Sequence, residues 1–263
     1  MKHDDSTALK CHHHEMHPDP VHHREGGEDA ELLRCRGLVV GWNHRALLPP
    51  IDLSIRRGRF TAVLGRNGSG KSTWFKTILG QTPPIAGSVE QLPALEHIAY
   101  VPQSTVFDRI LPLTARDVVM QGRLHCNNFL WPFPRKADRV AVSRALEQAG
   151  AGDLAMETFR DLSKGQRQRI MFARMLATEA DLALLDEPTA AMDYVAEREA
   201  MDQLAHLAKA HDIAVVLISH ALDIAERHAD DILFFDRVAG EVVFGPKAEV
   251  MESPIYRRHL RGE

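Results

Sequence analysis

Cysteine is scarce in this chain of 263 residues, and the three present, Cys11, Cys35 and Cys126, are scattered. A small, odd number of scattered cysteines argues against a disulfide framework and fits a reducing cytoplasm. Long apolar runs are also lacking: no stretch of about 18 or more apolar residues occurs, so no transmembrane helix is expected. The first residues are polar, so we expect no secretory signal. Any association with a membrane should therefore be peripheral and made through a partner.

Charge of one sign is not in excess either. The formal net charge is only -4, which gives no electrostatic reason to expect nucleic acid as a partner. What the chain does have is apolar content, because 44% of its residues are hydrophobic. That is enough for a sizeable core, and the length predicts one large domain or two small ones.

Residues 1–30 differ in composition from the rest of the chain. They contain seven of the fifteen histidines, with acids, two prolines and almost no aliphatic residues. Such a segment cannot bury enough apolar surface to offset its chain entropy, so we predict a disordered His-rich tail. Imidazole and thiolate suit Zn²⁺, Cu or Ni²⁺ and suit Mn²⁺ less well. A weak Zn²⁺ site is one interpretation, and an incidental His-rich tail or a cloning remnant is the other. The candidate zinc ligands are His12, His13, His14 and His17.

Apolar patterns in the remaining chain predict alternating strands and helices. Strands are expected at residues 36–42, 51–57, 60–64, 98–101, 182–186, 213–218 and 231–236. Helices are expected at 71–79, 194–211, 221–228, 246–251 and 254–260, and residues 113–178 are mostly helical in pattern, with Thr114 as an N-cap. This order predicts an α/β fold with a mixed or parallel sheet core, flanked by helices and interrupted by a helical insert.

The segment Gly65-Arg66-Asn67-Gly68-Ser69-Gly70-Lys71-Ser72-Thr73 matches a phosphate-binding loop between a strand and a helix. Its glycines let the backbone curl so that N–H groups point at phosphate oxygens, and the helix N-terminus adds partial positive charge. We expect Lys71 to reach the β- and γ-phosphates and the Ser72 hydroxyl to ligate Mg²⁺. The alternative, a chance glycine turn, does not explain the full pattern. The residues expected to bind nucleotide are Gly65, Asn67, Gly68, Ser69, Gly70, Lys71, Ser72 and Thr73.

Two acids follow the apolar run 182–185. Asp186 and Glu187 stand at the carboxyl end of this predicted strand, the edge where open α/β sheets bind ligands. Asp186 is expected to hold Mg²⁺, and Glu187 is then available to polarise a water as general base. An ordinary strand end followed by a proline turn is the alternative for these residues taken alone.

A third motif, Leu162-Ser163-Lys164-Gly165-Gln166-Arg167-Gln168-Arg169, lies between the loop and the acids. In this order the three motifs resemble those of ABC-type ATPases, and the resemblance covers about residues 32–245. It implies a nucleotide-binding domain at 31–245 with a helical subdomain at about 108–178, followed by a helical extension at 246–263. Further matches are the Q-loop glutamine Gln103, the switch histidine His220, the D-loop Ala191-Met192-Asp193 and the adenine-stacking Trp42.

The resemblance implies a head-to-tail dimer that sandwiches two Mg·ATP. One subunit would supply Trp42, Lys71, Ser72, Gln103, Asp186, Glu187 and His220, and the other Ser163 and Gly165. Ser72, Gln103 and Asp186 would hold Mg²⁺, while Glu187, His220, Gln103 and Lys71 would act in hydrolysis. Lys164 replaces the family's usual glycine, and a residue with a Cβ resists positive φ, so we expect ordinary helical or bridge backbone there. The Lys164 side chain either tunes ATP turnover or points to solvent.

The segment Leu111–Arg123 is similar to ATPase subunits of zinc- and manganese-type importers. Phe107, Leu111 and Leu113 either contact a membrane subunit or belong to the core. Together with the His-rich tail this favours zinc import, with a second copy of the chain, an integral membrane permease and, indirectly, an extracytoplasmic metal-binding protein as partners at the cytoplasmic face of the membrane. The alternatives are import of iron, manganese or a metal chelate, a non-transport ABC ATPase of the iron–sulfur assembly type, and a metal-binding regulator that uses nucleotide as a switch.

Overall fold

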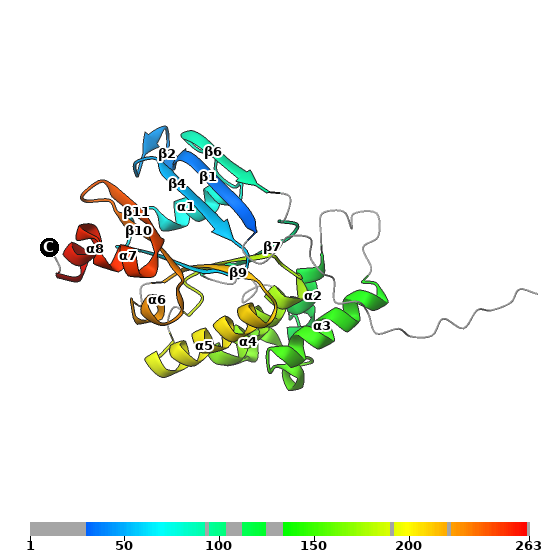
Figure 1. Ribbon diagram of the computed structural model, residues 1–263. Helices are drawn as coiled ribbons and strands as arrows, with labels where there is room; N and C mark the ends of the chain where they lie inside the picture. The colour runs from blue at the N-terminus through cyan, green and yellow to red at the C-terminus, as the bar shows by residue number, and fades with distance from the viewer. Residues whose placement is uncertain are drawn as a thin grey trace, which may run out of the picture.

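The computed structural model describes residues 30–92, 95–103, 112–124, 134–189, 192–219 and 222–261. A six-stranded sheet in the order β11-β10-β5-β9-β8-β7 forms its centre (Figure 1). The strands are β5 (Phe60–Gly65), β7 (Ile98–Val101), β8 (Leu182–Asp186), β9 (Ala214–Ile218), β10 (Asp231–Asp236) and β11 (Glu241–Pro246). All neighbours pair in parallel except β11, which is antiparallel to β10. This confirms the predicted α/β fold with a mixed sheet.

A second, antiparallel sheet lies over one face of the central sheet (Figure 1). Its order is β4-β1-β6, formed by β1 (Glu31–Val39), β4 (Ile51–Arg56) and β6 (Ala86–Gln91). The short hairpin of β2 (Gly41–Trp42) and β3 (Arg45–Ala46) follows β1. The strand predicted at 36–42 is therefore wrong in its bounds, because the chain leaves β1 after Val39 and β2 begins at Gly41. No strand was predicted for β6 or β11.

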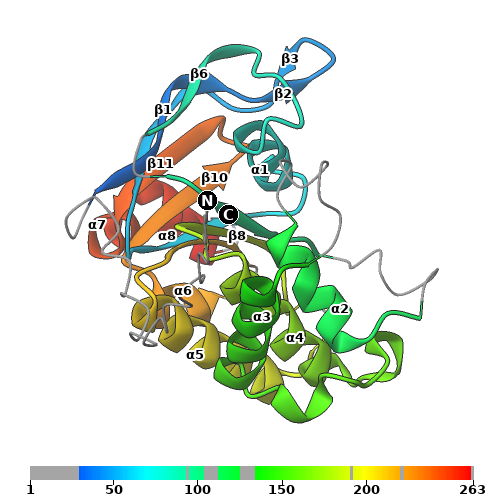
Figure 2. The same cartoon turned by 90° about the vertical axis from the view of Figure 1, so that its right-hand side faces the viewer.

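Helices cover the opposite face of the central sheet, and α1 packs between the two sheets (Figures 1 and 2). The α-helices are α1 (Lys71–Ile78), α2 (Ala115–Met120), α3 (Lys136–Gln148), α4 (Lys164–Ala177), α5 (Tyr194–Ala210), α6 (Leu222–His228), α7 (Lys247–Glu252) and α8 (Pro254–Arg261). Short 3₁₀ turns are η2 (Gln121–Arg123), η4 (Gly152–Leu154) and η5 (Phe159–Asp161). The predicted cap at Thr114 is confirmed, because its hydroxyl accepts the Asp117 N–H in a capping box.

Two hydrophobic clusters fill the space on either side of the central sheet. In β8, Ala183 and Leu185 face the helical layer, whereas Leu182 and Leu184 face α1 and the antiparallel sheet. This alternation follows from the period of two along a strand, and it explains why the buried strands read as continuous apolar runs. The sheet is thus covered on both faces, and polar side chains gather at the ends of its strands instead of along them.

The remaining chain-wide predictions concern cysteine, membrane helices and the tail. Cys35 is buried and free, and burial raises the pKa of its thiol to about 12. Cys11, Cys126 and the His-rich segment 1–29 lie outside the described residues. Within the described ranges, no helix has the length and apolar character needed to span a membrane. The helix predicted from Pro246 begins one residue later, since Pro246 ends β11 and precedes α7.

Candidate functional site

The phosphate-loop segment connects β5 to α1, as its sequence pattern predicts. Gly65 has φ 145°, and a Cβ there would lie 2.5 Å from the Phe235 carbonyl oxygen. Gly70 has φ 108° at the N-cap of α1. Both positions require glycine, the first for close backbone approach and the second for its left-handed conformation. The loop therefore curls over the start of α1 with Asn67 and Gly68 exposed and Ser69 buried.

Lys71 lies beneath this loop and is only 5% exposed. Its Nζ donates to the carbonyl oxygens of Gly65, at 2.7 Å, and Arg66, at 3.2 Å. Burial lowers the pKa of Lys71, while the carboxylates of Glu187 and Asp186 oppose that shift. The structure thus brings a buried cation and two acids to one place at the carboxyl edge of the central sheet.

Ser72 and Asp186 meet across the gap between α1 and β8. The Ser72 hydroxyl donates to Asp186 Oδ1 at 3.4 Å. Burial raises the pKa of Asp186, and the Ser72 hydrogen bond and nearby Lys71 partly offset it. A hydroxyl oxygen beside a carboxylate oxygen is a hard donor pair that suits Mg²⁺, which usually binds one or two protein oxygens with substrate phosphates. Within the described ranges, no group of three or more His, Cys, Asp or Glu is arranged to hold a metal.

Glu187 and Gln103 form the second contact at this edge. Gln103 Nε2, just beyond β7, donates to Glu187 Oε2 at 2.6 Å. Glu187 has φ 47°, and its N–H donates to the Ile218 carbonyl oxygen at 3.1 Å. The chain therefore turns sharply after β8 and directs the Glu187 carboxylate toward the Q-loop position. A carboxylate held this way can act as a base if a water is bound beside it.

The other predicted site residues make none of the contacts described above, and two of them lie outside the described residues. Trp42 lies on the β2–β3 hairpin and is 60% exposed. Thr73 belongs to the first turn of α1, where its carbonyl accepts the Thr77 hydroxyl. Asp193 caps α5 by accepting the Ala196 N–H at 2.9 Å. His220 and Ala191 lie outside the described residues.

The Ser163 segment forms the N-terminus of α4. Ser163 Oγ accepts the Gln166 N–H at 3.3 Å, and Gln166 Oε1 accepts the Ser163 N–H at 2.8 Å. Lys164 opens the helix, so the expectation of ordinary helical backbone there is confirmed. Ser163, Lys164 and Gly165 are exposed, and a Cβ at Gly165 would meet nothing within 4 Å. This helix end is therefore accessible to another molecule.

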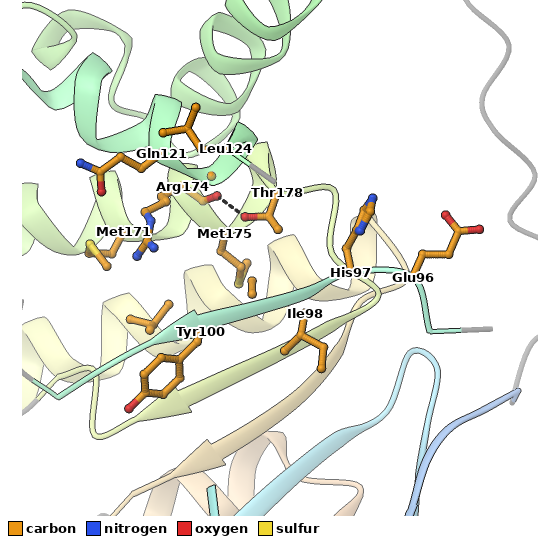
Figure 3. Close-up of a pocket in the computed structure, with 13 residues that line it drawn as sticks. Glu96, His97, Ile98, Tyr100, Gln121, Leu124, Met171, Arg174, Met175 and Thr178 are labelled. Carbon is orange, nitrogen blue, oxygen red and sulfur yellow. Dashed lines mark hydrogen bonds between the residues drawn. The ribbon is translucent and has the colours of Figure 1, made fainter. Parts of the chain in front are cut away.

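A groove of about 260 Å³ lies between β7 and the helical layer (Figure 3). The edge strand β7 forms one side, with Ala99 and Val101 toward the helical layer and Ile98 and Tyr100 pointing to the other face of the sheet. Met171, Arg174 and Met175 of α4 lie on the other side, with Leu124 at the rim. Leu113 packs against the helical-side core, while Phe107 and Leu111 lie outside the described residues. The sequence did not predict this groove, because it joins segments that are far apart in the chain.

Sequence reasoning also missed Arg237, in the turn after β10. Its Nη1 donates to the Gly68 carbonyl oxygen at 3.0 Å and so contacts the tip of the phosphate-loop segment. An arginine in a surface turn gives no local signal of this role. Only the pairing of β10 with β5, which sets Phe235 opposite Gly65, brings it there.

The amino-acid sequence of this chain is similar to those of known proteins. The family profile described as ABC transporter matches residues 48–190. The chain is 33% identical over 214 residues to the high-affinity zinc uptake system ATP-binding protein ZnuC of Bacillus subtilis (strain 168), covering 78% of this chain and 91% of that protein. It is 35% identical over 218 residues to the manganese transport system ATP-binding protein MntB of the same strain, covering 81% and 86%.

Solved structures agree with these matches. A chain of an inward-facing ABC transporter assigned to the metal-chelate type has a TM-score of 0.77 and 28% identity, over 88% of this chain and 89% of that chain. CbiO1 of Clostridium perfringens, part of the ABC transporter complex cbiONQ, has a TM-score of 0.72 and 27% identity, over 89% and 96%. The chain therefore belongs to the ATP-binding subunits of ABC transporters, a family of ATPases.

Proposed function

We propose that this ATPase powers an importer for a transition-metal ion and that the ion is Zn²⁺. The similarity to ZnuC and MntB, at 33% and 35% identity over most of the chain, is the observation that carries the metal assignment. The His-rich tail, residues 1–30, favours zinc over manganese, because imidazole nitrogens suit Zn²⁺ better than Mn²⁺. We also infer that the chain works at the cytoplasmic face of the membrane.

The roles proposed for the ATP site come from the family resemblance, and the positions of the described side chains support them. Lys71 leaves the loop carbonyls to bind the β- and γ-phosphates, while loop N–H groups from Gly65 to Thr73 hold the other phosphate oxygens. Trp42 stacks on the adenine. Ser72, Asp186 and Gln103 hold Mg²⁺, which neutralises phosphate charge when bound. Because Lys71 and Asp186 are buried, their charges act where water screens them little.

Glu187 is the proposed general base for the attacking water. In the structure Gln103 Nε2 donates to its carboxylate at 2.6 Å. The approach of the γ-phosphate brings Gln103 to the phosphate edge, and the carboxylate is then available to take the proton of the water. His220 is proposed to orient the water and the γ-phosphate, although it lies outside the described residues.

Two copies are proposed to close head to tail over two nucleotides. The exposed N-terminus of α4 then meets the γ-phosphate held by the partner, with the Ser163 hydroxyl donating and the Gly165 N–H close by. The hydroxyl already accepts the Gln166 N–H, so its own proton remains for a phosphate oxygen. ATP binding thus closes the dimer, and hydrolysis lets it open.

The groove beside β7 is the proposed docking site for the permease. Met171, Met175 and Leu124 offer apolar contacts to a short helix of the membrane subunit, and Arg174 of α4, opposite β7, fits a carboxylate or a helix C-terminus. Burial lowers the pKa of Arg174, so an acidic partner group would be favoured there. Since β7 leads directly to Gln103, a partner in the groove also contacts the strand that ends at the hydrolytic site.

Metal uptake by cells tests the proposed cargo. Disruption of the gene should lower ATP-dependent uptake of radioactive Zn²⁺, and the wild-type chain should restore it where Lys71→Ala does not. Mn²⁺ uptake measured in the same cells is the matched control. Loss of Mn²⁺ uptake with normal Zn²⁺ uptake would retain metal import but reject zinc, and unchanged uptake of both would reject metal import.

We further propose that the tail binds Zn²⁺ through His12, His13, His14 and His17. Calorimetric titration of the full chain should show a Zn²⁺ site that disappears when these four residues are replaced by alanine. The ATPase rate of that variant, measured without added zinc, should equal that of the wild type. An unchanged Zn²⁺ isotherm would remove the tail from the proposal, and a lost ATPase rate would instead favour a regulatory tail.

A further inference from the structure

Arg167, in the first turn of α4, binds the chain that leads into Ser163. Its Nε donates to the Leu162 carbonyl oxygen at 3.0 Å, and its Nη2 donates to the Arg160 carbonyl oxygen at 2.5 Å. Its backbone N–H donates to the Ser163 carbonyl oxygen at 2.9 Å. One residue therefore binds three of the four carbonyls between Arg160 and Ser163.

The same guanidinium covers a buried ring. The Arg167 Cζ lies 5.9 Å from the centroid of Phe159, which is 1% exposed and belongs to the helical-side core. Phe159 begins η5, the 3₁₀ turn that ends two residues before Ser163. Arg167 thus connects a fixed point in the core to the exposed entry of α4. A planar guanidinium with five donors can make both side-chain bonds at once, whereas a lysine ammonium has no such fixed fork.

The direction of the Ser163 hydroxyl depends on this entry. Leu162 and Ser163 are both extended, with ψ 146° and ψ 162°, and the helix starts only at Lys164. The reciprocal bonds of Ser163 and Gln166 fix the serine relative to the helix. They do not fix the preceding chain. The contacts of Arg167 with Arg160 and Leu162 supply that second constraint.

We propose that Arg167 is a positioning residue that presents Ser163 and the N-terminus of α4 to the γ-phosphate held by the partner subunit. This rests on the proposed role of Ser163 and Gly165 in the closed dimer. Arg167 itself touches no phosphate in the proposal. It acts through the backbone of residues 160–163, so its loss should weaken ATP-driven closure while leaving nucleotide binding within one subunit intact.

The experiment uses full-length protein carrying Glu187→Gln, in which the proposed loss of the base should slow hydrolysis so that the closed dimer accumulates. Arg167→Ala, Arg167→Lys and Ser163→Ala are compared with Arg169→Ala, a control on the same helix whose Nη1 donates to the Gly150 carbonyl oxygen at 2.7 Å. Light scattering measures the ATP concentration needed for dimer formation. A fluorescent ATP analogue measures binding to the monomer, and thermal unfolding checks the fold.

Arg167→Ala should need about tenfold more ATP to dimerise, as expected for loss of a charge-assisted hydrogen bond. Its affinity for the analogue should stay within about twofold of that of the control variant. The analogue binds the monomer at the phosphate-loop site, and Arg167 has no proposed part in that site. Arg167→Lys should need an ATP concentration between that of Arg167→Ala and that of the Arg169→Ala control. It becomes the informative variant if Arg167→Ala does not fold. Dimerisation of both Arg167 variants at the control ATP concentration overturns the inference. If Ser163→Ala also dimerises at the control ATP concentration, the proposed contact of Ser163 with the partner's γ-phosphate is rejected as well. If Ser163→Ala is defective while both Arg167 variants are normal, only the role of Arg167 is rejected.

Discussion

At the scale of single residues, Glu187 has the most unusual backbone of the site. Its φ of 47° is left-handed, a conformation that costs a residue with a long side chain about 1 kcal/mol or more. The turn is set by the Glu187 N–H bond to Ile218 and places the carboxylate against Gln103. The fold thus maintains local strain where it needs a directed acid.

Substitution of Glu187 should distinguish the cost of its left-handed backbone from the contribution of its carboxylate to ATP hydrolysis. Glu187→Asn and Glu187→Ala both lose the carboxylate and the Gln103 contact, so both should reduce ATP hydrolysis at least about 100-fold. Asparagine tolerates left-handed backbone better than alanine, so the Asn variant should be more stable than the Ala variant by about 1 kcal/mol. Urea unfolding of the two variants measures this difference. Equal stabilities would mean that the backbone at 187 relaxes in solution.

At the scale of secondary-structure elements, the sequence predicts the bounds of strands that are buried on both faces of the sheet. β8 and β10 have the predicted bounds, because an apolar run that ends at polar residues marks a strand between two core layers. The edge strand β7 also has the predicted bounds, although only its alternate residues are fully buried. β6 and β11 were missed for the opposite reason. β6 is an edge strand with mostly exposed residues in Ala-Gly-Ser-Val-Glu-Gln, and β11 ends in Gly245-Pro246. Pairing with β1 and β10, not side-chain pattern, specifies these two strands.

The residues of the candidate site likewise fall into two groups, those that a local sequence motif predicts and those whose contacts depend on the order of the strands. Gly65, Lys71, Ser72 and Asp186 could be predicted because their motif is local and its geometry follows from one loop and one strand end. The bond between Gln103 and Glu187 joins residues 84 apart and exists only because β7 and β8 are neighbours. The same holds for Arg237 at Gly68, 169 residues away. Contacts of this kind follow from topology, which a single sequence does not state.

The contact between α5 and α6 should make stability depend on pH through His228. Its Nε2 lies 2.9 Å from Asp202 Oδ1, and its ring faces Phe60. Burial lowers the pKa of His228 from 6.5, assisted by Arg227 and Lys247 and opposed by Asp202. Between its ordinary pKa and the lowered one, the unfolded chain binds more protons than the folded protein. The free energy of unfolding should therefore decrease as the pH falls through this window.

Replacement of His228 by glutamine should flatten that dependence. Glutamine keeps a donor for Asp202 but does not titrate, so the decrease in unfolding free energy below pH 6.5 should become shallower. Urea unfolding at several pH values measures the slope, with His206→Gln on the exposed face of α5 as the control. A slope as steep as that of the wild type would assign the pH dependence to other groups.

At the scale of the whole molecule, one buried ion pair joins the two sheets. Arg57, just after β4, donates to Asp181 Oδ1 at 2.8 Å, just before β8, and the side chains are 2% and 4% exposed. Asp181 Oδ2 also accepts the N–H groups of Glu96 and His97, at 2.8 and 3.1 Å, at the start of β7. A single carboxylate therefore connects the antiparallel sheet to two strands of the central sheet, at the opposite end of β8 from Asp186.

Loss of this carboxylate should destabilise the whole protein without altering its chemistry. Asp181→Ala leaves the Arg57 charge without that carboxylate in the interior and should reduce the free energy of unfolding by about 3–5 kcal/mol. Glu241→Ala, which removes the exposed pair with Arg258, should cost less than about 1 kcal/mol. Arg57→Met combined with Asp181→Ala should recover part of the loss, because the buried cation is then absent. Urea unfolding of the wild type, Asp181→Ala, Arg57→Met and the double variant gives the coupling energy of the pair. Similar costs for Asp181→Ala and Glu241→Ala would show that the two sheets are held together by their shared apolar core alone.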